Sequence, residues 1–89
     1  PDYTQEEKKI IFSSFALPKV LKRIGLEQGE IVLTDDGLDE LIEQYRDTSG
    51  IRDLEQAAEH LAANALYQIE VDHLKQVVFD ADMVKKLFA

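Results

Sequence analysis

Cysteine is absent from this 89-residue chain, and so are long runs of apolar residues. Without cysteine the chain has neither a disulfide framework nor a thiolate nucleophile, which is typical of cytosolic proteins, so we expect a cytoplasmic location. No apolar stretch approaches the roughly 20 residues of a membrane-spanning helix, and no charged-then-apolar leader opens the sequence. These absences predict a small soluble domain that does not enter a membrane.

Residue patterns that carry catalysis or bind metals are missing as well. The two histidines, His60 and His73, have no cysteine or carboxylate pattern around them that would bind zinc. Glu70 and His73 form one Glu-x-x-His motif, whereas a di-iron bundle needs two copies and two further glutamates. No glycine is followed by lysine, as the phosphate-binding P-loop requires. We therefore expect no catalytic residue and no metal site in this chain.

Basic residues are few, with ten Lys and Arg against eighteen Asp and Glu, and the net charge is −8. The imbalance lies in residues 30–80, where three basic and thirteen acidic residues give −10. Such a segment repels phosphate over long distances. We expect no broad nucleic-acid-binding face, and any anion site must be local.

The chain begins with Pro1 rather than methionine, and a helix signal follows within three residues. We interpret residues 1–89 as one domain that is part of a longer protein.

The first 24 residues carry two helix signals separated by a proline. Thr4 and Glu7 have the spacing of a capping box, which predicts the start of a helix. Pro18 disfavours helical geometry at the preceding residue, so we expect this helix to end near residues 15–16 and a second to begin at Pro18. Gly25 is expected to end the second helix in a left-handed conformation. The apolar side of the first helix is predicted to be Ile10, Ile11 and Phe15.

Two short apolar runs and three further helices complete the expected fold. The predicted elements are, in chain order, a strand at 30–34, a helix capped by Thr34 or Asp35 and broken at Ser49-Gly50, a long helix at 51–69, a strand at 76–79 and a helix capped by Asp80. The strands are too far apart for a tight hairpin, so they should pair in parallel through the helical crossover. The expected fold class is α+β, mostly α: a bundle of four to five helices with two short parallel strands.

A local anion site is suggested at the start of the long helix, where Arg52 lies. Free N–H groups and the helix dipole favour an anion at a helix N-terminus, and a guanidinium adds a planar fork suited to phosphate. The residues alone leave a second interpretation open, in which Arg52 pairs with Asp47, Asp53 or Glu55 at the surface.

A set of short motifs extends over essentially the whole chain in a recognisable order. They are Tyr3-Thr4, Glu7-Lys8, Leu17-Pro18-Lys19, residues 31–36, Tyr45, Gly50-Ile51-Arg52, Leu54-Glu55 and residues 77–88. In order and spacing they resemble the small α-subdomain of the AAA+ module in Lon proteases. The Leu-Pro-Lys and Gly-Ile-Arg-x-Leu-Glu motifs are the most specific of them.

The resemblance implies a lid that follows a large nucleotide-binding subdomain and precedes a proteolytic domain in the same chain. It places the sensor-2 arginine of the family on Arg52, with Gly50 and Ile51 close to the nucleotide. Arg52 would then sense the γ-phosphate of ATP, which the large subdomain binds with magnesium, and couple the nucleotide state to lid rotation. The parent would be an ATP-dependent serine protease and a homo-oligomeric ring, a hexamer, whereas this chain alone would be a monomer without activity.

The sequence departs from the family at four positions that commonly carry basic residues. They are Asp47, Gln56, Ala63 and Asn64. These differences indicate a divergent member, and they predict a weakened ATPase or a changed subunit contact in the parent.

A second hypothesis comes from the negative charge alone. It describes a free-standing acidic helical adaptor that binds a basic or apolar partner through one helix face. This hypothesis predicts a partner affinity that falls as salt is added. The face with Asp39, Glu40 and Glu43, like the side chain of Lys19, is otherwise interpreted as a solvated surface.

Overall fold

The order of the elements agrees with the expected one. The computed structural model describes residues 3–47 and 50–89. The elements are α1 (Gln5–Ile11), a π-helical turn (Phe12–Ala16), α2 (Leu17–Ile24), a 3-10 turn (Gln28–Glu30), β1 (Ile31–Leu33), α3 (Asp35–Gln44), α4 (Ile51–Val71), β2 (Val77–Phe79) and α5 (Ala81–Leu87). The α+β, mostly α fold class is confirmed. The helix α3 ends at Gln44, before the expected break; Ser49 lies outside the described residues.

Side-chain caps set the starts of three helices, as the sequence predicts. The Thr4 hydroxyl accepts a hydrogen bond from the backbone N–H of Glu7 at 3.1 Å, and the Glu7 carboxylate accepts one from Thr4 at 2.9 Å. Thr34 caps α3 by accepting from the N–H of Gly37, and Asp80 caps α5 by accepting from the N–H of Met83. Gly25 ends α2 with φ at 83°, a left-handed conformation that glycine adopts without steric cost.

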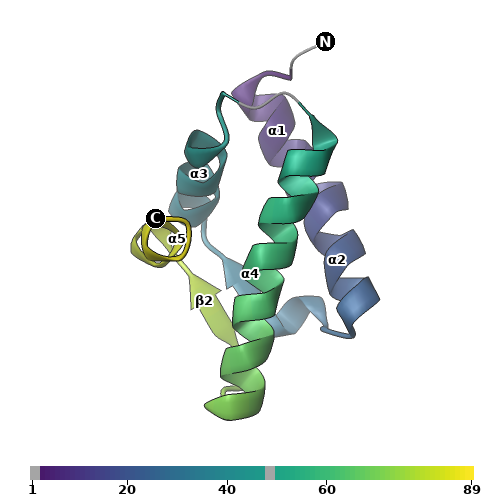
Figure 1. Cartoon of the computed structure of the whole chain (residues 1–89), viewed down its shortest axis with the longest axis vertical. Helices are drawn as coiled ribbons and strands as arrows, with labels where there is room; N and C mark the ends of the chain where they lie inside the picture. The colour runs from purple at the N-terminus through teal and green to yellow at the C-terminus, as the bar shows by residue number, and fades with distance from the viewer. Residues whose placement is uncertain (1–2, 48–49) are drawn as a thin grey trace.

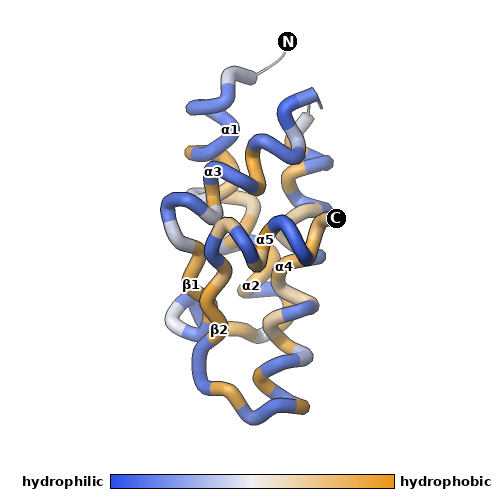
Figure 2. Tube along the Cα trace, turned by 90° about the vertical axis from the view of Figure 1, so that its left-hand side faces the viewer, coloured by the Kyte–Doolittle hydropathy of each residue, from blue (hydrophilic) through white to orange (hydrophobic). Residues whose placement is uncertain are grey.

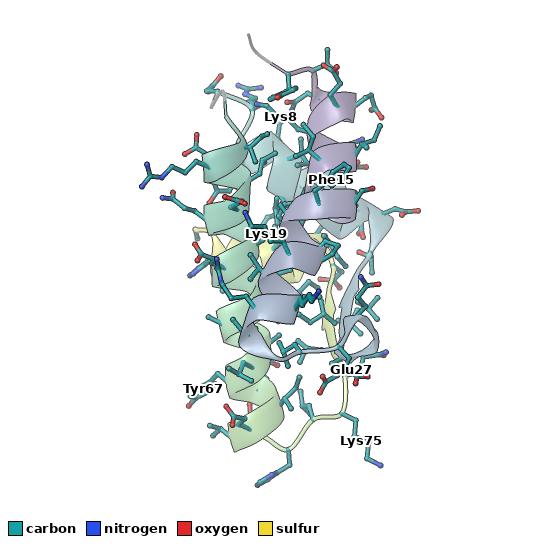
Figure 3. The ribbon with its side chains drawn as sticks, turned by 90° about the vertical axis from the view of Figure 1, so that its right-hand side faces the viewer. Lys8, Phe15, Lys19, Glu27, Tyr67 and Lys75 are labelled. Carbon is teal, nitrogen blue, oxygen red and sulfur yellow. The ribbon has the colours of Figure 1, made fainter. Side chains whose placement is uncertain are left out.

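The break predicted before Pro18 is wrong. Ala16 and Leu17 both keep right-handed helical dihedrals, and the N–H of Leu17 donates to the carbonyl of Phe12, five residues earlier. This wider π-helical turn accommodates Pro18, which has no N–H of its own to donate. Consequently α1, the π-helical turn and α2 form one rod that runs alongside α4 (Figure 3).

The predicted apolar side of the first helix is also wrong in part. The side chains of Ile10 and Phe15 are 60% and 67% exposed, and Ile11 is half-buried. Phe12 is instead completely buried, together with Lys8 and Ala16. The residues of this rod that pack on the core therefore recur every four positions. One of them, Lys8, is charged.

The two strands pair in parallel, which confirms the expected crossover. Ile31 lies opposite Val77, and Leu33 lies opposite Phe79. The N–H of Thr34 extends the ladder by donating to the Phe79 carbonyl at 3.1 Å. Both strands are apolar and lie side by side in Figure 2. Since two strands alone are marginal in water, the helices that cover them supply most of the stabilising contacts.

The long helix α4 is the centre of the fold. In Figure 1 it runs along the long axis, with α2 on one side and α3, α5 and the strands on the other. Ala57, Ala58 and Ala62 are fully buried and let neighbouring elements approach closely, whereas Ala63 is exposed. The largest fully buried side chains are Phe12, Phe79, Leu41, Ile42, Leu54, Leu61, Val20 and Val84.

Within residues 3–47 and 50–89, no helix is both long enough and apolar enough to cross a bilayer. The same residues contain no buried side-chain nitrogen or oxygen that lacks a hydrogen-bond partner. The buried polar side-chain atoms in this part of the chain are therefore all compensated by hydrogen bonds.

Candidate functional site

Arg52 lies in the first turn of α4, as the sequence predicts. Gly50 occupies the N-cap in an extended conformation, with φ at −180° and ψ at 154°. Because glycine has no side chain, the cap residue itself offers no acceptor to the first-turn N–H groups. Arg52 is exposed, and the neighbouring Ile51 is 46% exposed. The three residues predicted to lie near a nucleotide thus form one accessible helix start.

The alternative in which Arg52 pairs with a nearby carboxylate is not found. Among the described residues, no carboxylate lies within 4.0 Å of the Arg52 guanidinium. Glu55 instead accepts a hydrogen bond from Lys19 Nζ at 2.6 Å, and Asp47 lies 4.0 Å from Arg46. Arg52 therefore keeps its charge available for an anion from outside this part of the chain.

Lys8 is a residue of this region that the sequence reasoning missed. Its side chain is 2% exposed, and its ammonium donates hydrogen bonds to the carbonyl oxygens of Tyr45, at 3.0 Å, and Arg46, at 3.1 Å. Carbonyls at a helix C-terminus lack helical partners and carry partial negative charge, so they are suitable acceptors for a cation. A signal was present in the sequence, because Lys8 precedes Phe12 by four residues and so shares its face.

Tyr45 connects the end of α3 with two other helices. Burial raises the pKa of its phenol, and the negative charge of Asp53, in the first turn of α4, raises it further. The Tyr45 ring also meets the ring of Phe88 edge-on, with centroids 5.9 Å apart. The end of α3, Lys8 of α1 and the end of α5 therefore meet at Tyr45.

Two ion pairs join α2 to α4. Lys19 Nζ lies 2.6 Å from a Glu55 carboxylate oxygen, and an Arg23 guanidinium nitrogen lies 2.5 Å from Glu59. Lys19 was interpreted as a solvated side chain, and it is exposed but paired. The two pairs lie one helical turn apart along the α2–α4 seam, the line of contact between these helices. On each helix the two paired residues are separated by four positions.

Glu55→Gln is expected to lower the melting temperature slightly at pH 7 and to have no effect in acid. The hydrogen bond from Lys19, together with its charge, holds the pKa of the Glu55 carboxyl below its ordinary value of 4.5. A lowered pKa means that the stabilisation is complete above the ordinary value and is lost as the pH falls through the folded-state value. Thermal unfolding of both proteins between pH 7 and pH 3 measures this; a difference that persists at the acid end would contradict it. Glu70→Gln, at an exposed glutamate with no ion pair in the described residues, is the control.

The histidines take part in packing or lie at the surface. His60 Nε2 is 3.0 Å from the carbonyl oxygen of Leu87, and its ring meets Phe88 edge-on at 5.0 Å. His73 is exposed in the turn after α4, with a positive φ of 60°. In the part of the chain that the structure describes, no three His, Cys, Asp or Glu side chains are grouped so that they could hold a metal ion.

The acidic face of α3 consists of the exposed Asp39 and Glu43 and the half-buried Glu40, and all three have partners. Asp39 lies 2.6 Å from Lys9 Nζ, and Glu43 lies 2.9 Å from Arg46. Glu40 accepts a hydrogen bond from Gln44 at 2.8 Å. Because these carboxylates already have partners within the chain, the face offers less charge to a basic partner than the sequence suggests.

The four departures from the family pattern lie outside the core. Asp47, Gln56 and Ala63 are exposed. Asn64 is half-buried, and its side-chain oxygen accepts a hydrogen bond from Gln68 at 2.6 Å. The fold therefore does not depend on basic residues at these positions.

Comparison with known proteins gives one consistent group of relatives. No family model matches the chain. The chain is 32% identical over 85 residues to the Lon protease of Buchnera aphidicola and 34% identical over 85 residues to that of Rickettsia bellii. Each alignment covers 94% of this chain and 11% of the relative. The Lon protease of Lawsonia intracellularis is 40% identical over 55 residues, which is 62% of this chain and 7% of that protein.

Proposed function

Since the chain is a divergent relative of a short segment of Lon proteases, we propose that it is the lid subdomain of a Lon-like ATP-dependent protease. The observation that carries this proposal is the similarity along 94% of the chain. Because that similarity covers only 11% of the relatives, a nucleotide-binding subdomain and a protease domain would belong to other parts of the same protein. The lid itself would have no catalytic residue.

In this proposal Arg52 is the sensor-2 residue. An exposed guanidinium at a helix N-terminus, with no carboxylate partner among the described residues, fits a phosphate group. ATP with magnesium, bound mainly by the large subdomain, would supply the phosphoryl group for hydrolysis. Arg52 would bind its terminal oxygens and stabilise the charge that develops on them. Gly50 and Ile51 would lie beside the nucleotide without touching the reacting atoms.

The geometry of α4 suggests how the nucleotide state reaches the rest of the lid. Its 21 residues, Ile51–Val71, include Arg52 in the first turn and end just before the turn that leads into β2. Since Leu54, Ala58 and Leu61 are buried along it, the helix and its neighbours should move as one packed body. Such a rotation would couple ATP hydrolysis to ring motion and substrate translocation. The partners would be the other domains of the chain and further copies in a hexameric cytoplasmic ring; the isolated chain would be a monomer.

The sequence of the complete gene tests this proposal most directly. We expect a P-loop upstream of residue 1 and a Ser-Lys protease domain downstream of residue 89. A short gene with its own start codon, coding for neither, would overturn the proposal and favour the acidic adaptor. The paired carboxylates on α3 already weigh against the adaptor.

Gly50→Asp is expected to change stability and activity in opposite directions. The new carboxylate would cap α4 and interact favourably with its dipole, which adds about 0.5 kcal/mol to the free energy of unfolding. The same negative charge would repel phosphate at Arg52, so the KM for ATP in the longer protein should rise several-fold. Thermal unfolding of the 89-residue chain and steady-state ATPase kinetics measure the two effects. Gly29→Asp, which adds the same charge in the 3-10 turn instead of at the N-cap of α4, is the control; equal KM values for the two variants would contradict the prediction.

A further inference from the structure

The outer edge of β1 keeps backbone groups that the sheet does not use. In a parallel pair, alternate residues of a strand direct their N–H and C=O groups toward the neighbouring strand and away from it. The N–H of Thr34 donates to Phe79 of β2, so Leu33 directs its two backbone groups to the opposite side. In the part of the chain that the structure describes, the sheet has no third strand, and β1 lies at one margin of the molecule (Figure 2). Leu33 therefore offers a donor and an acceptor to an added strand.

An apolar groove of about 220 Å³ lies beside this edge. The described residues that line it come mainly from the rod, β1 and α3, and not from β2. The apolar ones are Leu17, Pro18, Leu21, Ile31, Leu33 and Leu38. Pockets for small organic ligands generally measure about 300–1,000 Å³, so this groove is suited to single apolar side chains. Since side chains alternate along a strand, a segment paired with Leu33 would direct every second side chain toward the groove.

The residues on both sides of β1 are acidic. Glu27 and Glu30 precede the strand, Asp35 and Asp36 follow it, and residues 27–36 contain no lysine or arginine. Within the described residues, none of these four carboxylates forms an ion pair. A segment with basic residues at its ends would therefore match the charge around β1. A second copy of β1 would instead bring like charges together, which disfavours self-pairing.

We propose that the outer edge of β1 binds an extended segment of a partner protein, in which an apolar residue lies between basic residues. The segment pairs with the backbone of Leu33, places its apolar side chain in the groove and directs its basic side chains to the carboxylates at the two ends of β1. The rod side of the groove is not acidic, because the exposed Lys22 follows Pro18 by one helical turn. The inference does not depend on the proposed function, since it uses only residues of the 89-residue chain.

The capped peptide Lys-Lys-Val-Leu-Val-Lys-Lys, added to the ¹⁵N-labelled 89-residue chain, tests this inference by NMR. We expect saturable binding, and at saturation the hydrogen exchange of the Leu33 N–H should slow by about tenfold or more, since this donor becomes paired. The peptide Glu-Glu-Val-Leu-Val-Glu-Glu should bind at least about tenfold more weakly. Three results would each overturn the proposal: no saturable binding, equal binding of the two peptides, or slower exchange at Val78 of β2 instead of Leu33.

Ser13→Trp tests the groove, because Ser13 is exposed and lines it. An indole in the groove would exclude the apolar side chain of the peptide and weaken binding by about tenfold or more. Ser14→Trp is the matched control, since Ser14 is an exposed neighbour that does not line the groove, and its affinity should stay within about twofold of the unchanged chain. Equal affinities of the two variants would mean that the groove is not the binding site.

A pair of charge variants separates the ends of β1 from the overall charge. Glu27→Gln combined with Asp35→Asn should weaken binding of the basic peptide by about threefold, because two exposed partners of its lysines are lost. Glu70→Gln combined with Asp72→Asn gives the same net charge but changes the end of α4, and it should leave the affinity unchanged. Equal losses in the two variants would overturn the proposal. So would exchange at Leu33 that slows with chain concentration in the absence of peptide, because a second copy would then occupy the edge.

Discussion

Replacing Arg52 by alanine is expected to lower ATP turnover of the longer Lon-like protein by on the order of 10²-fold. A guanidinium that binds the developing charge on the phosphoryl oxygens acts mainly in the transition state, so the loss should appear chiefly in kcat. The 89-residue chain should remain folded, because Arg52 is exposed and has no ion pair within the described residues. Steady-state ATPase assays and thermal unfolding of the isolated chain measure the two effects separately.

Arg23→Ala is a suitable control for this experiment. Arg23 is also an exposed helical arginine, but it lies on α2 and pairs with Glu59. Its removal should leave kcat within about twofold of the unchanged protein, as expected for a surface substitution. Unchanged turnover in Arg52→Ala would remove the sensor-2 role. A large fall in melting temperature of the isolated chain would instead make Arg52 a structural residue.

Gly37→Ala is expected to destabilise the domain by about 1–3 kcal/mol, although alanine is the better helix former. Gly37 lies in the first turn of α3, and a Cβ there would approach the carbonyl oxygen of Phe79 and the carbonyl carbon of Asp80, at 3.2 Å. Both are backbone atoms at the end of β2, so neither can rotate away. The added methyl must separate α3 from the sheet.

The matched control is Gly29→Ala, where a Cβ would have no neighbour within 4 Å. For a domain of this size, each 1 kcal/mol lowers the melting temperature by roughly 4–8 °C. Gly37→Ala should therefore unfold well below the unchanged chain, and Gly29→Ala should unfold close to it. If Gly37→Ala unfolds at the same temperature or higher, helix propensity outweighs the steric contact and the close packing of α3 on β2 is wrong.

Local signals predicted most of the fold. Thr4, Thr34 and Asp80 start their helices because each accepts a hydrogen bond from a backbone N–H that the helix leaves unsatisfied. The parallel pairing followed from the distance between the two strands. These features depend on residues that are close in the sequence or on the number of residues between the two strands. Both can be read directly from the sequence.

The misplaced face of the first helix shows what local signals cannot decide. Residues 10, 11, 12 and 15 are all apolar, so more than one face of this helix could have packed on the core. Contacts with α4 direct Phe12 toward the core. Pro18 is accommodated by a wider, π-helical turn and does not end the helix. Lys8 was overlooked because a lysine on an amphipathic helix is usually solvated; its acceptors come from a helix about 37 residues away in the sequence.

The placement of Arg52 could be predicted, because Gly50 and the following helix pattern mark the start of α4. That Arg52 has no carboxylate partner within residues 3–47 and 50–89 could not be predicted, since this depends on Glu55 binding Lys19 across the α2–α4 seam. The role of Arg52 toward a nucleotide is a proposal that rests on this geometry and on the related Lon sequences.

The π-helical turn at Phe12–Ala16 has a consequence for how the chain tolerates changes in length. An α-helix repeats about every 3.6 residues, so side chains spaced by four drift steadily around a regular helix. One under-wound turn in the middle of the rod opposes this drift, and it keeps Lys8, Phe12, Ala16 and Val20 directed at the core on both sides of it. Deleting Ser13 or Ser14 would restore a regular α-helix in which Lys8, Phe12, Ala16 and Val20 are spaced i, i+4, i+7 and i+11, so they would still share one face. A helix one residue shorter should thus be more regular in its backbone and keep its contacts with the core.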